Sequence, residues 1–307
     1  MTTPISKNMT LVDWAMLLVL SVLWGGSFFF VELLVDVLPL FTIVTLRVAL
    51  AAAALWLFIL LTGQFQKLPA KVWLAFLIMG LLNNAIPFSL IVSGQQDLSS
   101  GLAAILNATT PLFTVLVAGF LLADEKITRN KFIGVCVGLL GVVLIMGFDV
   151  LYALGQNLVA QLLVLGAALS YAFAAAYGRR FKPMKVAPIM VAAGQLTGSS
   201  LIMIPFAVLF DQPFDPAAVQ YHSWLALIGL ALFSTAIAYI LFFRILASSG
   251  ATNLALVTFL IPVSAIMLGV FFLGEQIGLQ HLLGMLLIGA GFTVIDGRLW
   301  QTRVVKG

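Results

Sequence analysis

The chain has 307 residues, of which 63% are hydrophobic and only 8% are charged. Soluble domains carry roughly 25% charged residues, so this composition excludes a water-soluble globular protein and indicates a chain surrounded by lipid. Its net charge of +4 is spread over short connections instead of one basic face, which argues against a nucleic-acid partner. Because Cys136 is the single cysteine, the sequence predicts no internal disulfide and no thiolate metal site.

Apolar runs of about twenty residues follow one another along the chain, and each is long enough to cross a bilayer as a helix. They predict an all-α integral membrane protein of ten transmembrane helices. The predicted helices are 12–31, 39–61, 71–92, 98–121, 130–147, 157–177, 186–209, 222–243, 249–272 and 279–297. Since no sizeable soluble domain fits between them, we expect any functional site to lie among the helices.

The charges between these helices indicate an orientation, because Lys and Arg collect on the cytoplasmic side of a membrane. If the N-terminus is cytoplasmic, the C-terminus is too, and fourteen of the fifteen basic residues fall in cytoplasmic segments. These are Lys7, Lys67, Lys71, Lys126, Arg129, Lys131, Arg179, Arg180, Lys182, Lys185, Arg244, Arg298, Arg303 and Lys306. The predicted outer connections instead hold the acidic residues Glu32, Asp36, Asp97, Asp149, Asp211, Asp215 and Glu275.

The two halves of the chain are similar to each other. A shift of 150 aligns Gly134, Gly141 and Gly147 with Gly284, Gly291 and Gly297, and a shift of 151 aligns Pro111 with Pro262. We therefore predict two repeats, residues 1–150 and residues 151–307, the second ending in a short cytoplasmic tail. Because each repeat has five helices, the second is inverted, and inverted repeats are typical of carriers that work by alternating access.

Several short strings also match a known family. They are Trp24-Gly25-Gly26-Ser27-Phe28, Leu46-Arg47, Pro111 and Ala123-Asp124-Glu125-Lys126, with Pro262 and Leu273-Gly274-Glu275-Gln276 in the second half. Over residues 12–297 the chain resembles the drug/metabolite transporter superfamily, specifically the EamA-type ten-helix exporters. The resemblance implies a multi-pass permease of the bacterial inner membrane that exports amino acids, other metabolites or drugs. It also implies a central cavity, with the fifth and tenth helices at the periphery.

Dimer contacts in that family commonly involve the peripheral helices. The pattern Gly134-x-x-x-Gly138 lies in the predicted fifth helix and matches a motif for close helix packing. The sequence therefore allows a homodimer, although packing within the chain explains the same glycines.

Arg47 is the one basic residue that lies well inside a predicted span. A lipid-facing charge there costs several kcal/mol, roughly 2.5–3.5 on insertion scales, so the side chain should face the interior and have a partner. One interpretation is that Arg47 binds an anionic group of a solute, such as a carboxylate. The alternative is a structural pair with a helix end or with Glu32.

Polar and aromatic side chains near mid-span complete the candidate binding site. Asn83 and Asn84 lie midway along one predicted helix, and Asn107 precedes Pro111, which breaks another. Trp24, Phe88, Tyr171 and Tyr239 could line an apolar cavity. The alternative for each is ordinary packing between neighbouring helices.

Catalysis is not expected, because the sequence has no nucleotide-binding glycine loop, no metal-spaced ligand cluster and no nucleophile beside a base. We predict neither catalytic residues nor a metal or cofactor. No Asp or Glu lies at mid-span, which disfavours proton coupling.

The sequence thus predicts a membrane transporter that exports small neutral or zwitterionic metabolites, with amino acids first. The expected partners are a small-molecule substrate and membrane lipid. Two alternatives stay open: an efflux carrier for lipophilic drugs or metabolites, and a non-transporting receptor or assembly subunit.

Overall fold

The computed structural model describes residues 9–98, 100–264 and 278–296. Every regular element in these ranges is helical, and seven of the described helices are long and apolar enough to cross a membrane. The protein is therefore an all-α, multi-pass membrane protein, as its composition predicts. Some residues used in the charge map and the repeat alignment lie outside the described ranges. They are Lys7, Glu275, Gly297, Arg298, Arg303 and Lys306.

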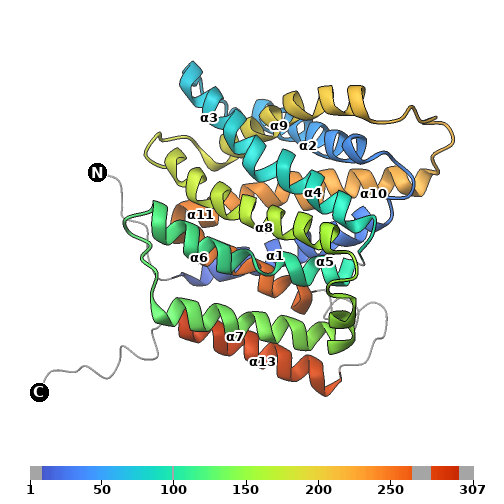
Figure 1. Ribbon diagram of the computed structural model, residues 1–307. Coiled ribbons are helices and arrows are strands. Elements are labelled where there is room, and N and C mark those ends of the chain that lie inside the picture. The colour runs from blue at the N-terminus through green and yellow to red at the C-terminus, as the bar shows by residue number, and fades with distance from the viewer. Residues whose placement is uncertain (1–8, 99, 265–277, 297–307) are drawn as a thin grey trace, which may run out of the picture.

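The helices of the first half follow the predicted apolar runs closely (Figure 1). In chain order they are α1 (Leu11–Glu32), α2 (Leu40–Thr62), α3 (Ala70–Gly80), the π-helical turn η1 (Leu81–Ala85), α4 (Ile86–Gln95), α5 (Ser100–Asn107), α6 (Thr110–Leu121), α7 (Arg129–Met146) and the 3-10 turn η2 (Phe148–Ala153). The span predicted over 98–121 is thus interrupted between α5 and α6, just before Pro111.

The second half repeats this pattern with one clear departure from the prediction. Its elements are α8 (Leu158–Gly178), the 3-10 turn η3 (Arg179–Phe181), α9 (Pro188–Phe210), α10 (Tyr221–Ala231), the π-helical turn η4 (Leu232–Ile237), α11 (Ala238–Ala255), a helical stretch over 257–264 and α13 (Leu279–Asp296). A break was predicted over residues 244–248, and the structure has it slightly later, at Gly250 within α11. The chain changes direction inside α11 at Gly250 (φ 83°, ψ 178°), where glycine tolerates the positive φ.

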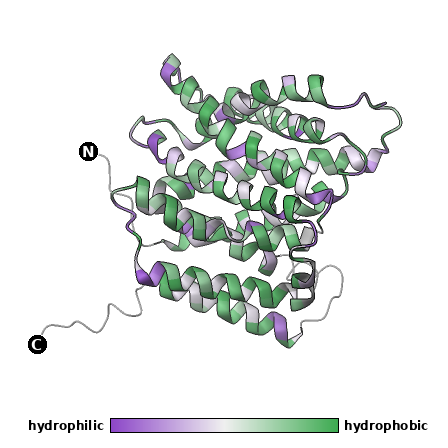
Figure 2. Cartoon of the chain, in the orientation of Figure 1, coloured by the Kyte–Doolittle hydropathy of each residue, from purple (hydrophilic) through white to green (hydrophobic). Residues whose placement is uncertain are grey.

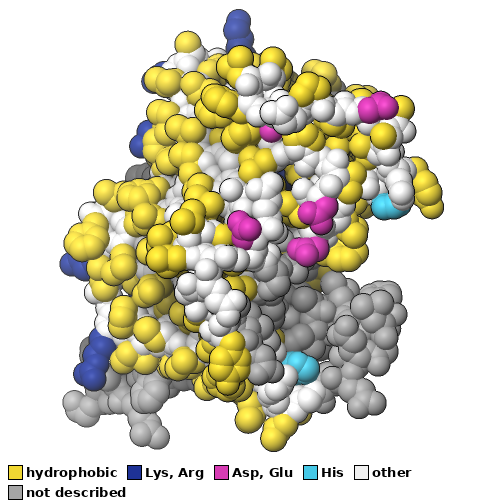
Figure 3. All heavy atoms as spheres, turned by 45° about the vertical axis from the view of Figure 1, so that its right-hand side comes forward, with side chains coloured by type: hydrophobic (Ala, Val, Ile, Leu, Met, Phe, Trp, Pro, Cys, Tyr) yellow, Lys and Arg dark blue, Asp and Glu magenta, His cyan; other side chains and the backbone are white. Residues whose placement is uncertain are grey.

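Apolar side chains cover the outside of the bundle as well as its core. Figure 2 shows that hydrophobic residues predominate along the helices. Leu57, Leu140 and Leu201 are more than half exposed on three different helices, as expected for residues that face lipid tails. Charged side chains lie mostly at the helix ends. Lys and Arg gather along one edge in Figure 3, away from the acidic residues that the same view shows. This separation agrees with the charge map predicted from the connections.

Two helices, α7 and α13, pack side by side at the edge of the bundle (Figure 1). A Cβ added at Gly141 would meet the carbonyl oxygen of Gly284 at 2.7 Å, and one added at Gly134 would meet that of Gly291 at 2.7 Å. The glycines therefore let the two backbones approach closely. Gly138 likewise faces the ring of Phe259. The glycines of the Gly134-x-x-x-Gly138 pattern are occupied by neighbours within the chain, so they supply no free surface for a homodimer.

We predict that Gly141→Ala destabilises the protein, because the new methyl group overlaps a backbone oxygen that cannot rotate away. Overpacking of this kind costs about 1–3 kcal/mol. The matched control is Gly289→Ala on the partner helix, where an added Cβ meets nothing within 4 Å. Thermal unfolding in detergent should show a lower midpoint for the first variant and an unchanged or higher one for the second. Equal midpoints would contradict the close packing of α7 on α13.

Candidate functional site

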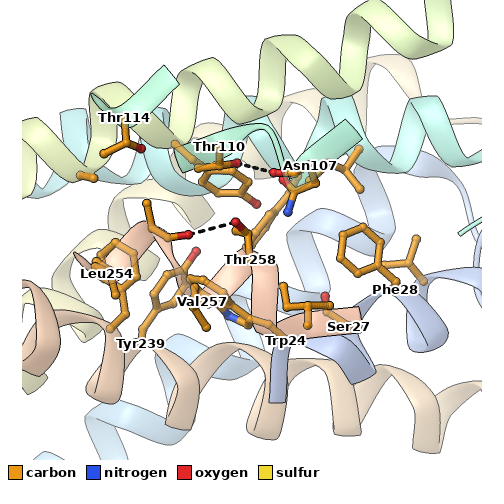
Figure 4. A pocket seen from close by; sticks show the side chains of 18 of the residues that line it. Trp24, Ser27, Phe28, Asn107, Thr110, Thr114, Tyr239, Leu254, Val257 and Thr258 are labelled. Atoms are coloured by element: carbon orange, nitrogen blue, oxygen red, sulfur yellow. Dashed lines mark hydrogen bonds between the residues drawn. The ribbon is translucent and has the colours of Figure 1, made fainter. Parts of the chain in front are cut away.

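The break between α5 and α6 follows from Pro111, which has no N–H to donate to the carbonyl of Asn107 four residues earlier. The hydroxyl of Thr110 donates to that carbonyl instead, at 2.6 Å. Inside a membrane every backbone polar group needs such a partner. Because the Thr110 hydroxyl replaces the missing backbone N–H, the helix can be interrupted here inside the membrane. The side chain of Asn107 then points into the cavity (Figure 4).

Pro87 has the same effect on the carbonyl of Asn83, which lies in the π-helical turn η1. The hydroxyl of Tyr239 donates to this carbonyl at 3.0 Å and accepts a hydrogen bond from the Asn84 amide at 2.8 Å. Asn83 in turn donates through its amide to Gln195 at 3.1 Å. These bonds join η1 to α11 and α9, so the asparagine pair ties the two halves of the chain together.

The second π-helical turn, η4, positions Thr235. Its hydroxyl donates to the carbonyl of Leu230 at 2.7 Å, a bond that spans five residues and fits the wide turn of a π-helix. The same oxygen accepts a hydrogen bond from Nε of Arg47 at 2.8 Å. The widened turn thus orients one lone pair of Thr235 toward the guanidinium.

A cavity of about 780 Å³, including its open part, lies where these breaks meet. Its wall is mostly apolar, with few polar groups (Figure 4). The lining residues are Trp24, Ser27, Phe28, Val31, Arg47, Phe88, Ile91, Val92, Gln95, Asn107, Thr110, Thr114, Tyr171, Ala175, Tyr239, Phe242, Leu254, Ala255, Val257, Thr258 and Ile261.

Arg47 is the charged residue of this wall, and its side chain is only 5% exposed. The guanidinium carbon lies 3.6 Å from the centre of the Phe88 ring, which places the positive charge over the negative face of the π system. Among the residues that the structure describes, no carboxylate lies within ion-pair distance of Arg47. Glu32, the structural partner considered from the sequence, contacts Gln95 instead, at 3.5 Å.

Three buried oxygens of residues on the cavity wall have no hydrogen-bond partner in the part of the chain that the structure describes. They are Oε1 of Gln95, Oδ1 of Asn107 and Oγ1 of Thr114. An unpaired buried acceptor costs about 1–3 kcal/mol, so a ligand or a side-chain movement that brings an N–H or O–H group to these atoms is favoured. The wall therefore offers one cationic donor and several neutral acceptors between aromatic surfaces.

The structure brings together six of the eight site residues that the sequence predicts. Those on the wall are Trp24, Arg47, Phe88, Asn107, Tyr171 and Tyr239. Asn83 and Asn84 lie behind the wall in the network around Tyr239. Sequence reasoning missed Phe28, Gln95 and Thr114. Phe28 belongs to the string Trp24-Gly25-Gly26-Ser27-Phe28, whereas nothing in the pattern around the other two marks them as inward-facing.

The end of the bundle that holds the connection between α6 and α7 is closed by Glu125, which is 9% exposed. Its carboxylate accepts hydrogen bonds from the backbone N–H groups of Ala251 (2.9 Å) and Thr252 (3.3 Å) and from the Thr252 hydroxyl. It also pairs with Arg179 at 3.2 Å and lies 3.8 Å from Lys131. The carboxylate thus caps the helix that restarts after Gly250, where the exposed N–H groups favour a negative charge.

A second carboxylate holds the other side of the same bend. Asp13, near the start of α1, accepts a hydrogen bond from the Ser248 hydroxyl at 2.6 Å. It also closes a capping box with Thr10. The bend at Gly250 is therefore fixed from both sides by residues of the first half. Ala175 on the cavity wall lies only four residues, or ~6 Å, before Arg179, so this clamp, the floor of the cavity, lies just outside the lining at this end.

Comparison with known proteins identifies the family of this chain. The EamA-like transporter family matches residues 13–147 and again residues 158–295. The chain belongs to the EamA-like transporter family. This EamA chain is also 27% identical to the "Uncharacterized transporter YoaV" of Bacillus subtilis (strain 168), over 88% of this chain and 92% of that one. It is 28% identical to the "Uncharacterized inner membrane transporter YedA" of Escherichia coli (strain K12), over 85% and 83%.

A solved crystal structure has the same fold, with a TM-score of 0.74 and 20% identity, and the match covers 96% of this EamA chain and 99% of the solved one. The likeness in fold therefore spans both halves of the chain. Membership of the family shows that the chain is a membrane transporter in general terms.

We predict that Tyr239→Phe destabilises the protein by about 1–3 kcal/mol, because it leaves the Asn83 carbonyl and the Asn84 amide buried without their partner. Tyr171→Phe is the matched control, since Tyr171 lines the same cavity and its hydroxyl makes no hydrogen bond to a described residue. Unfolding in a denaturing detergent, followed by circular dichroism, gives both free energies. A control variant as unstable as the first would show that the tyrosine network carries no special role.

A further prediction concerns the floor of the cavity. In a Cys136→Ala background, a cysteine introduced at Ala175 reports whether reagent reaches the cavity from the Glu125 side. Glu125→Ala should accelerate labelling by a membrane-impermeant thiol reagent on that side by about tenfold, as loss of a buried acceptor worth ~1.4 kcal/mol implies. Asp124→Ala is the control, because Asp124 is half exposed and its ion pair with Arg179 contributes little. Equal labelling in the two variants would show that Glu125 does not close this end.

Proposed function

We propose that this EamA-family chain exports small neutral or zwitterionic metabolites, with amino acids first, through the central cavity by alternating access. The observation that carries the proposal is the position of Arg47. Its guanidinium is buried in the cavity wall, held at Nε by Thr235 and on one face by Phe88. A planar guanidinium fixed in this way presents its remaining N–H groups to a ligand, and a carboxylate matches their geometry.

The rest of the wall favours a ligand with one carboxylate and an apolar body. A single cation is too little for a multiply charged phosphate ligand, which usually meets several basic side chains. None of the described lining residues is acidic, so the wall offers no counter-charge for a lipophilic cation. Trp24, Phe28 and Phe242 supply ring surfaces for an apolar side chain, and the free oxygens of Gln95 and Asn107 suit an ammonium or amide group.

The proposed mechanism rests on a ten-helix architecture of two inverted repeats, residues 1–150 and 151–307. Three observations support it. The family matches the chain twice. A shift of 151 carries η1 (Leu81–Ala85) onto the first five residues of η4 (Leu232–Ile237). The contacts of Gly134 with Gly291 and of Gly141 with Gly284 are exchanged by the shift of 150, as a twofold relation requires.

In this account both termini lie in the cytoplasm, and the location is the bacterial inner membrane, as for the relative named an inner membrane transporter. We assign the clamp around Glu125 to the cytoplasmic end, which it closes, so that solute enters or leaves the cavity from the other side in this conformation. Export would require the inverted arrangement, in which the clamp is released and the outer end closes.

The test is flux of radiolabelled amino acids in proteoliposomes of the purified protein. We expect saturable flux in the wild type and a loss of at least about tenfold in Arg47→Ala, since one charge-assisted pair is worth ~1.5–3 kcal/mol. The control is Arg180→Ala, because Arg180 also stacks on an aromatic ring, that of Tyr177 at 3.4 Å, but is exposed and lies outside the cavity wall.

If no amino acid is transported, the substrate assignment is wrong. Saturable flux of lipophilic compounds with Arg47→Ala unimpaired would instead favour a drug or metabolite efflux carrier.

A further inference from the structure

We propose that Arg47 makes this carrier an exchanger: the protein changes conformation readily only while a carboxylate of the solute is paired with the guanidinium. The inference rests on the proposed function and adds to it the mode of transport. It follows from the contacts that the protein itself gives to Arg47.

The protein's own groups satisfy the guanidinium of Arg47 only in part. Its Nε donates to Thr235 and one face covers the Phe88 ring, but no hydrogen bond joins its terminal amino groups to a described residue. Neither contact carries a negative charge. Since Arg47 lines a cavity with an open part, solvent or a ligand group can complete its hydrogen bonds in this conformation.

Alternating access requires a state in which the cavity is closed at both ends. Closure of the cavity expels water, and a cation that loses water without gaining an anion is strongly destabilised. The wall offers the guanidinium only neutral groups at this step, and the acceptors of Gln95, Asn107 and Thr114 are themselves neutral. A charge inside the membrane is tolerated when it is paired, so an anionic ligand removes the obstacle.

The position of Arg47 also couples the charge to the moving parts. Arg47 belongs to α2 of the first half, while its partner Thr235 belongs to η4 of the second half. A movement of one half against the other must therefore change the surroundings of the guanidinium. A ligand shifts a conformational equilibrium only by its differential affinity for the states, and a carboxylate has its greatest effect on the closed state, where the charge is least solvated.

Two consequences distinguish an exchanger from a simple facilitator. The empty carrier returns slowly, so net flux is slow, while one solute molecule moving in exchange for another is fast. Solute on the opposite side of the membrane stimulates uptake only if it carries a carboxylate. An amino acid should stimulate, whereas the corresponding amide, which has the same side chain and ammonium group but no negative charge, should not.

The experiment measures initial uptake of a radiolabelled amino acid that the protein transports into proteoliposomes. The vesicles contain unlabelled amino acid, its amide, or only a bulky sulfonate buffer that does not fit the cavity, and a potassium clamp holds the membrane potential at zero. We expect at least about tenfold faster uptake into vesicles loaded with amino acid than into the other two. Arg180→Gln should keep this ratio.

Arg47→Gln tests whether the charge of Arg47 causes the dependence of uptake on the internal solute. With the charge removed, the empty carrier no longer has an unpaired cation, so residual uptake should become independent of the internal solute. A variant that retains the tenfold ratio would overturn the role of Arg47. Should the variant be inactive, the wild-type comparison still decides.

Equal wild-type uptake into loaded and empty vesicles would overturn the exchange mechanism while leaving the transport function intact. Absence of saturable uptake under every loading would overturn both.

Discussion

One positive charge held inside an apolar helix bundle is the constraint on which this structure depends. The guanidinium of Arg47 sits in a wall that is otherwise neutral, and the protein stabilises it with a ring face and one hydroxyl instead of a carboxylate. Both contacts come from irregular parts of the helices. Thr235 lies in the π-helical turn η4, and Phe88 directly follows Pro87, which interrupts the backbone hydrogen bonds after η1. The helices are thus irregular at the positions that contact the charge of Arg47.

Hydrogen bonds to freed backbone carbonyl groups connect these irregular turns to neighbouring helices. Lipid offers no hydrogen bonds, so each carbonyl freed by a proline or a π-helical turn needs a donor from a side chain. Tyr239 serves Asn83, Thr110 serves Asn107, and Ser170 serves Leu82 at 2.7 Å. Two of these three donors come from the other half of the chain. The breaks that shape the cavity are consequently also the joints between the halves, which is where a carrier must move.

Much of this arrangement is predictable from the sequence, and the reasons differ by element. The spans emerge from length and hydropathy alone, and the inward direction of Arg47 follows from the cost of a charge in lipid. The opening of the helix before Pro111 follows from its missing N–H. By contrast, the π-helical turns have no sequence signal, because their residues, such as Leu81-Leu82-Asn83-Asn84-Ala85, also fit an ordinary helix.

The direction of polar side chains is also hidden from the sequence. Asn84 and Asn107 look equivalent as mid-span asparagines, yet the first donates to Tyr239 behind the wall and the second lies on the wall of the cavity. In a helix that is apolar on all sides, hydrophobic periodicity does not tell which face looks inward. The clamp is hidden for another reason: Glu125, Ser248 and Thr252 are brought together only by the bend at Gly250, in a region read as two separate helices.

The most direct test of the central claim, that Arg47 receives a carboxylate in this cavity, is ligand-induced thermal stabilisation of the purified protein. A ligand that binds only the folded state raises its stability by an amount set by concentration over Kd. Hydrophobic amino acids and their amides form matched pairs that differ in one negative charge. This account predicts a rise in the unfolding midpoint with the acid, little or none with the amide, and no difference between them in Arg47→Gln. Equal stabilisation by acid and amide in the wild type would contradict it.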